Sequence, residues 1–424
     1  MLSKRRKTKK GDPDVTSHGA ALTYRRCSQL TEVEMRRTAL SLLVALLAWG
    51  CSSAPAEDTT PNNDGADGDI NPPVAASRIA EFRLADQSGS RWYLDGTADT
   101  AATNLSSVPG HNAFWFAWSV FHPGTDIWEG EPISNATIEP DPSGDCTVPC
   151  NRIFQGCGGG RDCIPPLDSP TMVAADSPNA QYLADTDFVL GVLTSEGPRA
   201  YPHNILWWHE IANEEVGGDA YAVTLCPLTG SGLAFDRRGF VQGQTVRLGV
   251  SGLLYNSNLV MWDGETESLW SQMRLESVQG SEIGSPSPLR GVLEMTWGAW
   301  KALHADTLVI SEETGFPRDY QRYPYVRGGA DYRVNDADTF APTEPTPDAQ
   351  FENKDMVFGV IWNGEVKGYP WETLEAQSGA RQGVIADSVG GRSLSIVFDL
   401  DSGFVHAFES QVDGTDITLS IEAP

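Results

Sequence analysis

Residues 187–202 have the sequence DFVLGVLTSEGPRAYP, and the pattern returns without a gap at residues 355–370 as DMVFGVIWNGEVKGYP. Each copy begins with a run of apolar, strand-forming residues and reaches Tyr-Pro through a short turn. A short helical segment, a Gly-Gly turn and a second apolar strand follow in both places. We therefore predict two related units, each a pair of apolar strands with a short helix packed on one face.

Two further blocks extend the match on either side. AFWFAWSVFHPGT (113–125) matches MTWGAWKALHADT (295–307), and VGGDAYAVTLCPLTGSGLAF (216–235) matches VGGRSLSIVFDLDSGFVHAF (389–408). Three blocks in the same order are typical of an internal duplication.

The expected fold is α+β, predominantly β, with two related halves, mixed or antiparallel sheets and short helices. The halves are expected at residues 79–280 and 281–424, and the first folded residues are expected to form strands in IAEFRL and RWYL. Neither half has the longer strand–helix–strand spacing of a doubly wound sheet.

The first half contains a cysteine-rich insertion at residues 146–163 that the second half lacks. Its cysteines are Cys146, Cys150, Cys157 and Cys163. In an exported chain, four closely spaced cysteines typically form two disulfides, and three pairings are open. The alternative is a structural zinc site, although the spacing lacks a paired C-x-x-C pattern.

The segment Met35–Cys51, MRRTALSLLVALLAWGC, has the layout of an export signal. Its end resembles a bacterial lipobox, in which Cys51 is lipidated and becomes the mature N-terminus. The alternative is an ordinary signal peptide cleaved nearby. We expect an exported protein held in the bacterial cell envelope by this lipid, with the outer membrane or the periplasm as its location.

This interpretation divides the N-terminal region into three parts. Residues 1–34 are expected to be a start-site artefact, residues 35–51 the lipoprotein signal, and residues 52–78 a disordered tether rich in Pro, Asp, Asn and Ala.

The charge of the chain excludes one class of partner. From residue 52 onward there are 20 basic and 53 acidic residues, a balance of −33. A surface so acidic repels phosphate backbones, so no nucleic-acid partner is expected. The sequence leaves any cofactor or metal unknown, and an absence of cofactors is one of the open alternatives.

Reactive side chains concentrate in the first half, at positions where the two halves differ. His209 corresponds to Gln377 in the second half, Glu210 to Ser378, and Cys226 to Asp399. A cysteine near a histidine can form a thiolate nucleophile or, with an added carboxylate, bind a metal. Cys226, His209 and Glu210 are therefore the candidate reactive groups. The alternative is that Cys226 is a buried, inert residue.

A second set of candidates consists of polar and aromatic residues in segments that could hold a ligand. These candidate ligand-binding residues are Asn256, Asn258, Asp263, Trp270, Arg318 and Asp319. Turn formation and core packing are the alternative explanations for this set.

Four long motifs of the chain are YPHNILWWHEIAN, TLCPLTGSGLAFDR, GVSGLLYNSNLVMWD and TGFPRDYQRYPY. Through them the chain resembles a bacterial and archaeal family known as domain of unknown function 3179, and the resemblance covers most of residues 110–405. The family implies no particular activity. Its usual central motif is C-P-L-C, whereas this chain has Thr229 in place of the second cysteine, which disfavours a dithiol redox centre or a two-thiolate metal site.

Two hypotheses follow from these patterns. The first is an exported, lipid-anchored protein with a small-molecule or metal site around Cys226 and His209. The second is a non-catalytic envelope module that binds a ligand or a partner through its aromatic and Asn-rich loops. The sequence does not decide whether the protein is an enzyme.

Overall fold

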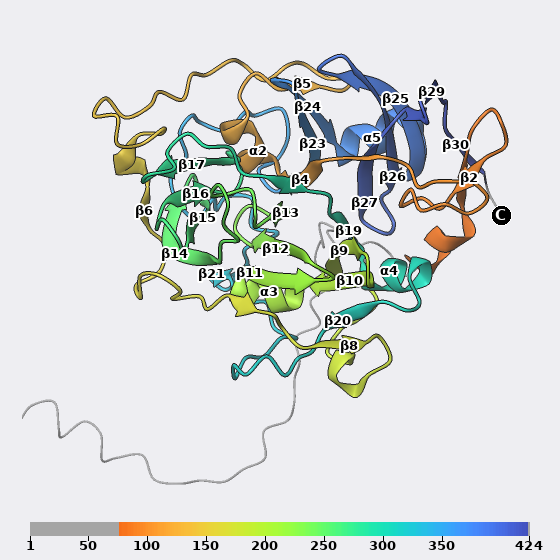
Figure 1. Cartoon of the computed structure of the whole chain (residues 1–424). Helices are drawn as coiled ribbons and strands as arrows, with labels where there is room; N and C mark the ends of the chain where they lie inside the picture. The colour runs from red at the N-terminus through yellow and green to blue at the C-terminus, as the bar shows by residue number, and fades with distance from the viewer. Residues whose placement is uncertain (1–75, 423–424) are drawn as a thin grey trace, which may run out of the picture. The chain divides into compact units, whose positions relative to one another are not determined.

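The computed structural model describes residues 76–422, all of which belong to one compact unit, Ala66–Pro424. The predicted signal, the predicted lipidation site Cys51 and the predicted tether up to residue 75 lie outside the described residues. The described chain is mostly β with short helices and mixed or antiparallel sheets, which confirms the expected fold class (Figure 1). Its four α-helices are α2 (Trp115–Phe121), α3 (His203–His209), α4 (Trp297–Leu303) and α5 (Trp371–Ser378).

The predicted hairpin at residues 187–202 is present and lies within a mixed sheet. Strands β9 (Phe188–Thr194) and β10 (Gly197–Pro202) pair antiparallel. Next to β9 lies β19 (Leu293–Thr296), and β20 (Leu308–Ile310) runs parallel to β10. With β8 (Met172–Ala174) at the edge, the strand order is β19-β9-β10-β20-β8.

The hairpin at residues 355–370 has the same surroundings. Strands β23 (Met356–Trp362) and β24 (Glu365–Pro370) pair antiparallel. They are flanked by β4 (Gly110–Phe114), antiparallel to β23, and by β5 (Asp126–Ile127), parallel to β24. The strand order β4-β23-β24-β5 repeats the first four strands of the other mixed sheet.

The two Trp-rich segments are exchanged between the predicted halves. The segment β4-α2-β5, from the N-terminal part of the chain, completes the sheet of the C-terminal hairpin, while β19-α4-β20 completes the sheet of the N-terminal hairpin. Figure 1 shows the orange β4 and α2 beside the blue β23 and β24. Strand pairing therefore crosses the boundary predicted at residue 280, and each half needs the other to complete a sheet.

Tryptophan packing on glycine holds each exchanged helix in place. A Cβ atom built on Gly359 would overlap the Trp118 ring, and one built on Gly191 would overlap the Trp300 ring. Each tryptophan also donates its indole N–H to a threonine just after the helix, Trp118 to Thr125 (3.2 Å) and Trp300 to Thr307 (2.8 Å). The large ring can approach the strand this closely only because the strand residue has no side chain.

Two further sheets, one mixed and one antiparallel, continue from the hairpins. After α3, strands β11 (Ile211–Val216), β12 (Asp219–Cys226) and β13 (Ser231–Asp236) form a meander. Strands β18 (Leu289–Arg290) and β7 (Leu167–Asp168) lie at its edges, which gives the order β18-β13-β12-β11-β7. After α5, strands β25 (Gln382–Val389), β26 (Arg392–Asp399) and β27 (Phe404–Glu409) form the other, with β3 (Ser107–Val108) at its edge.

One further sheet, also of five strands, lies entirely within the first half. It has the order β17-β16-β15-β14-β6 and consists of β14 (Leu248–Tyr255), β15 (Asn258–Asp263), β16 (Leu269–Ser271), β17 (Glu276–Gln279) and β6 (Phe154–Gln155). Strand β6 lies in the cysteine-rich insertion, whose pairs are Cys146–Cys150 and Cys157–Cys163. The predicted disulfides are thus present, and the structure selects one of the three pairings.

The N-terminal strands and the C-terminal strand meet in a small sheet. Strand β1 (Arg83–Ala85) pairs with β2 (Arg91–Trp92) and with β30 (Ser420–Glu422). The strand expected across IAEFRL is shorter than predicted, because Ala76–Glu81 form a 3-10 helix and only the end of the segment is extended. Among the described helices, none has the length and apolar character needed to cross a membrane.

The substitution Gly359→Ala tests the packing of the exchanged segment. The new Cβ would overlap the Trp118 ring within a rigid sheet, so we expect the free energy of unfolding to fall by about 3 kcal/mol. Gly158→Ala is the matched control, because a Cβ there meets nothing within 4 Å. Urea denaturation of both variants measures the difference, and equal stability of the two would contradict the packing described here.

Candidate functional site

Cys226 lies at the end of β12, as predicted, but it is fully buried. Its Sγ atom is 3.7 Å from the carbonyl oxygen of Ser257. Burial, together with the nearby carboxyl group of Glu210, raises the pKa of the thiol to about 11. A thiol in this environment is protonated at neutral pH and is a weak nucleophile.

His209 is the last residue of α3 and is also buried. Its Nδ1 atom lies 2.7 Å from the carbonyl oxygen of Pro165, which can only accept, so Nδ1 carries the proton. Its Nε2 atom therefore accepts a hydrogen bond from the Tyr320 hydroxyl at 2.8 Å. Burial lowers the pKa of His209 to about 4. Both ring nitrogens are engaged, and no hydrogen bond joins this ring to Cys226 in the part of the chain that the structure describes.

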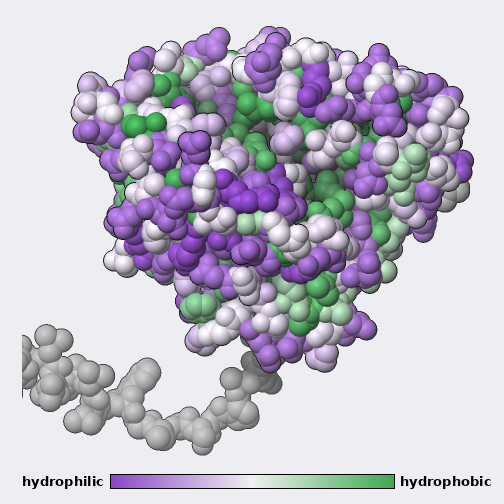
Figure 2. Space-filling model, viewed as in Figure 1, coloured by the Kyte–Doolittle hydropathy of each residue, from purple (hydrophilic) through white to green (hydrophobic). Residues whose placement is uncertain are grey.

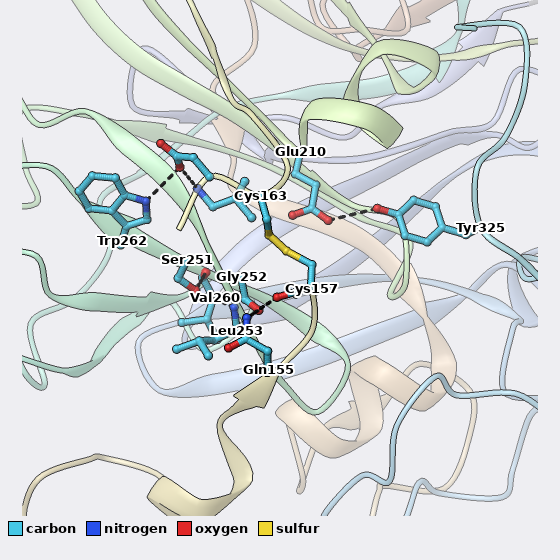
Figure 3. Close-up of a disulfide and its surroundings, with 12 residues drawn as sticks. Gln155, Cys157, Cys163, Glu210, Ser251, Gly252, Leu253, Val260, Trp262 and Tyr325 are labelled. Carbon is cyan, nitrogen blue, oxygen red and sulfur yellow. Dashed lines mark hydrogen bonds between the residues drawn. A yellow bond between two sulfur atoms is a disulfide. The ribbon is translucent and has the colours of Figure 1, made fainter. Parts of the chain in front are cut away.

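Glu210 follows α3 with a positive φ of 57° and a buried side chain. Tyr325 donates its hydroxyl to the carboxyl group at 3.4 Å, and Figure 3 shows these two side chains pointing toward each other. Burial raises the pKa of Glu210 to about 8. The structure thus brings Glu210 near Cys226 as a protonated, buried carboxyl group.

The two candidate asparagines form hydrogen bonds within the protein. Asn256 exchanges two hydrogen bonds with the backbone of Glu344, at 2.9 and 3.0 Å. Asn258 donates to the Thr229 hydroxyl and to the Gln272 side chain, and its Oδ1 accepts the backbone N–H of Met273. Their side chains are thereby satisfied without a ligand.

Asp263, Trp270, Arg318 and Asp319 do not converge with these residues into one site. The buried Asp263 carboxylate accepts the Trp270 indole N–H at 2.9 Å and several N–H groups of its own turn. Arg318 lies over the Trp208 ring, with 5.6 Å between the guanidinium carbon and the ring centroid. Asp319 accepts the backbone N–H of Gln321. These contacts shape turns and packing.

One segment of the chain supplies contacts to several of these candidates. The cover segment, residues 314–344, contributes the partners of His209, Glu210 and Asn256 described above. It also seals the turn after Cys226, because Tyr332 donates to the carbonyl oxygen of Leu228 at 3.0 Å. The residues described by the structure include no group of three or more His, Cys, Asp or Glu side chains placed to hold a metal ion.

A cleft of about 580 Å³ lies between the parts of the chain that contain α3 and α5. Its aromatic walls are formed by Phe114, Phe188, Trp207 and Trp371. Its basic side chains are His203, Arg333, Lys354 and Arg381. Its acidic side chains are Asp187, Glu294, Asp336, Glu352, Asp355, Glu372 and Glu375. Figure 2 shows hydrophobic residues in a recess in the middle of the face seen there, with hydrophilic residues around it.

A chain of polar contacts crosses between the two halves at this cleft. His203 Nε2 lies 3.3 Å from Glu294 Oε1, and Asn112 donates to the other oxygen of Glu294 at 3.1 Å. Trp371 in turn donates its indole N–H to Asn112 Oδ1 at 3.3 Å. The exchange of the Trp-rich segments creates these contacts, since β4 supplies Asn112 and β19 supplies Glu294.

Residues 161–422, more than half of the chain, match a family described as protein of unknown function (DUF3179). The chain belongs to this family. No curated protein and no solved structure matches it. Within this member of the domain of unknown function 3179 family, Thr229 is buried in the hydrogen-bond network of Asn258, Ser231 and Gln272.

Sequence reasoning missed the cleft residues for an identifiable reason. His203 corresponds to Trp371, Glu294 to Asn112, and Lys354 to Thr186, and each pair stands one residue outside a matched block. The criterion that selected His209, a difference between corresponding positions, selects these pairs too if the blocks are extended by one residue. What the sequence does not reveal is that segments far apart in the chain line one cleft.

Glu210→Gln tests the burial of the carboxyl group. Because the folded-state pKa of about 8 exceeds the ordinary value of 4.5, this group stabilises the fold fully below pH 4.5 and loses that contribution as pH rises through 8. A glutamine amide does not titrate and has no such loss, so the variant should be more stable than the wild type at pH 8, by roughly 2–4 kcal/mol, with the difference vanishing near pH 4.5.

The measurement is urea denaturation from pH 4.5 to 8 of the wild type, Glu210→Gln and the exposed neighbour control Glu215→Gln. The same pH dependence in all three proteins would show that Glu210 is ionised in the folded state.

Proposed function

We propose that this chain binds a small organic molecule in the cleft between its two halves. The observation that carries the proposal is that the cleft is lined by a buried polar atom without a hydrogen-bond partner in the described chain, Lys354 Nζ. Burying a polar group without a partner costs about 1–3 kcal/mol. Such groups are rare in native proteins and need a specific explanation, for which a ligand is the simplest here.

The size of the cleft fits this proposal. Sites for small molecules commonly have volumes of about 300–1,000 Å³, walls that are largely apolar and a few placed polar groups. The cleft has this composition, with two tryptophans, two phenylalanines and the polar side chains of His203 and Glu294.

The charge of the cleft narrows the class of ligand. Seven carboxylic side chains line it, whereas two of its three Lys and Arg side chains are already paired. Arg333 pairs with Asp331, and Arg381 pairs with Glu375 and Asp401. The excess of acid disfavours polyanions such as nucleotides and favours a neutral or cationic molecule with a flat apolar part.

The site predicted around Cys226 and His209 has less support as the functional centre. The thiol is buried and protonated, the imidazole is held by Pro165 and Tyr320, and the cover segment separates both from open solvent. We infer that this region stabilises the first half, while the cleft binds the ligand.

We propose in addition that the two halves arose by internal duplication. Support comes from the three matched sequence blocks and from the repeated strand order β19-β9-β10-β20 and β4-β23-β24-β5. The backbone N–H of Trp297 donates to Asp187 at 2.6 Å, and that of Trp115 donates to Asp355 at 2.7 Å, at corresponding positions.

The proposed location is the bacterial cell envelope, with a lipid on Cys51 as the membrane anchor. Support comes from the layout of residues 35–51 and from the disulfides Cys146–Cys150 and Cys157–Cys163, which are typical of oxidising compartments.

A neutral fluorescent probe, N-phenyl-1-naphthylamine, tests the proposed cleft. Val334 lines the cleft and Val326 does not, and both valines are 50% exposed. Val334→Trp should fill part of the cleft and weaken binding of the probe at least about tenfold, the effect of about 1.4 kcal/mol. Val326→Trp is the matched control and should bind as the wild type does. Fluorescence titration gives the dissociation constants, and equal affinity of both variants would place the probe elsewhere.

A further inference from the structure

Lys354 is a buried lysine that no acidic side chain of residues 76–422 pairs. Its residue is 7% exposed, it lines the cleft, and its Nζ atom has no hydrogen-bond partner within the described chain. Three aromatic rings surround the amine, with Nζ at 3.5 Å from the ring centroid of Tyr332, 4.7 Å from that of Phe116 and 5.1 Å from that of Phe114. Burial lowers the pKa of Lys354 to about 7, so a large share of the amine is uncharged at neutral pH.

The backbone around Lys354 is held on both sides. The carbonyl oxygens of Asn353 and Asp355 accept the N–H groups of Phe116 and Trp115 at the start of α2, at 3.1 and 2.7 Å. The Lys354 N–H itself donates to Asp336 Oδ1 at 3.0 Å. The exchanged Trp-rich segment thus fixes the backbone from which the lysine side chain extends along the cleft wall.

The other two lysines of residues 76–422 are in a different state. Lys301 lies 2.7 Å from Asp185, and Lys367 lies 3.1 Å from Asp126 and 2.9 Å from Asp387. At the position that corresponds to Lys354, the first half has Thr186, which carries no amine. An unpaired lysine amine is therefore specific to one side of the cleft.

We propose that Lys354 is a covalent attachment site for small aldehydes or ketones that enter the cleft, to which it binds as an imine. The inference rests on the proposed ligand-binding function of the cleft and adds the class of ligand. An amine that is desolvated and unpaired is the form of lysine that attacks carbonyl carbon.

The reaction balances without an oxidant or a further reactant. The Nζ lone pair forms a bond to the carbonyl carbon while the C=O π electrons move to oxygen, and a proton then passes from nitrogen to that oxygen to give a carbinolamine. The carbinolamine loses its hydroxyl group as water, a C=N bond forms, and the second amine proton leaves. Asp336 and Asp355 line the same cleft, and their carboxyl groups are available for these proton transfers.

The surroundings favour an uncharged carbonyl compound. The acidic side chains of the cleft disfavour keto acids, while the aromatic walls accept the apolar part of a small aldehyde. The imine nitrogen, when protonated, would lie among Phe114, Phe116 and Tyr332, whose rings stabilise a cation by cation–π attraction.

The test treats the full-length protein at pH 7 with the neutral probe glycolaldehyde and sodium cyanoborohydride, which reduces the imine to a stable amine. Peptide mass spectrometry then compares the rate of modification at Lys354, Lys301 and Lys367. We expect Lys354 to be modified at least about tenfold faster than the other two. The rate should rise with pH through a midpoint near 7, where the amine loses its proton. Val334→Trp should slow the reaction at Lys354, whereas Val326→Trp should leave it unchanged.

Lys354→Met keeps the length of the side chain without the amine, so it should acquire no adduct in the cleft. Modification of Lys354 no faster than of Lys301, in a protein that binds the naphthylamine probe in the cleft, would overturn the covalent site and leave the proposed binding function intact. If the protein also failed to bind the naphthylamine probe in the cleft, both the covalent site and the proposed binding function would be overturned.

Discussion

The close packing of two tryptophans on two glycines determines how the chain is assembled. Trp118 lies on Gly359 and Trp300 lies on Gly191, so each Trp-rich helix is fastened to a hairpin in the other half of the chain. Both contacts need a strand position without a side chain, and both are reinforced by an indole hydrogen bond to a threonine. Because the sheets are completed only by this exchange, the described chain forms one cooperative body rather than two neighbouring units.

The cleft is a consequence of the same exchange. Strands β4 and β19 bring Asn112 and Glu294 within 3.1 Å of each other, and the residues that follow Tyr-Pro in each hairpin, His203 and Trp371, complete the polar chain. Corresponding positions of the two halves thus meet near the cleft with different side chains. Two similar parts of the chain form the walls of the cleft, and the positions at which they differ determine its polar side chains.

The sequence was sufficient to predict the elements but not their pairing. The apolar blocks predicted the hairpins, the short helices and the predominance of β structure, and the spacing of Cys146 to Cys163 predicted two disulfides. Which Trp-rich segment completes which sheet depends on the fit of Trp118 on Gly359, and both halves offer the same glycine and the same tryptophan. In the sequence pattern, each Trp-rich segment fits either hairpin equally well. The exchange of the two segments therefore could not be derived from the sequence.

The candidate site shows a related limit. Residue chemistry singled out His209, Glu210 and Cys226, but Tyr320 and Tyr325, which form hydrogen bonds with His209 and Glu210, come from the cover segment, about a hundred residues away in sequence. Once Tyr320 and Tyr325 satisfy these groups, they become part of a buried polar core. The sequence marks Lys354 only by its difference from Thr186, because its unusual state comes from the rings of Phe114, Phe116 and Tyr332 around it.

The exchange of segments is the central claim, and cutting the chain between the predicted halves tests it most directly. Ile283 and Gly284 are exposed in the connection between β17 and β18, where a specific protease site can be inserted. The exchange predicts that, after cleavage, the two fragments remain together in native buffer and unfold in a single cooperative transition. Fragments that separate and unfold in two independent transitions would show that each half completes its own sheets, and would contradict this account.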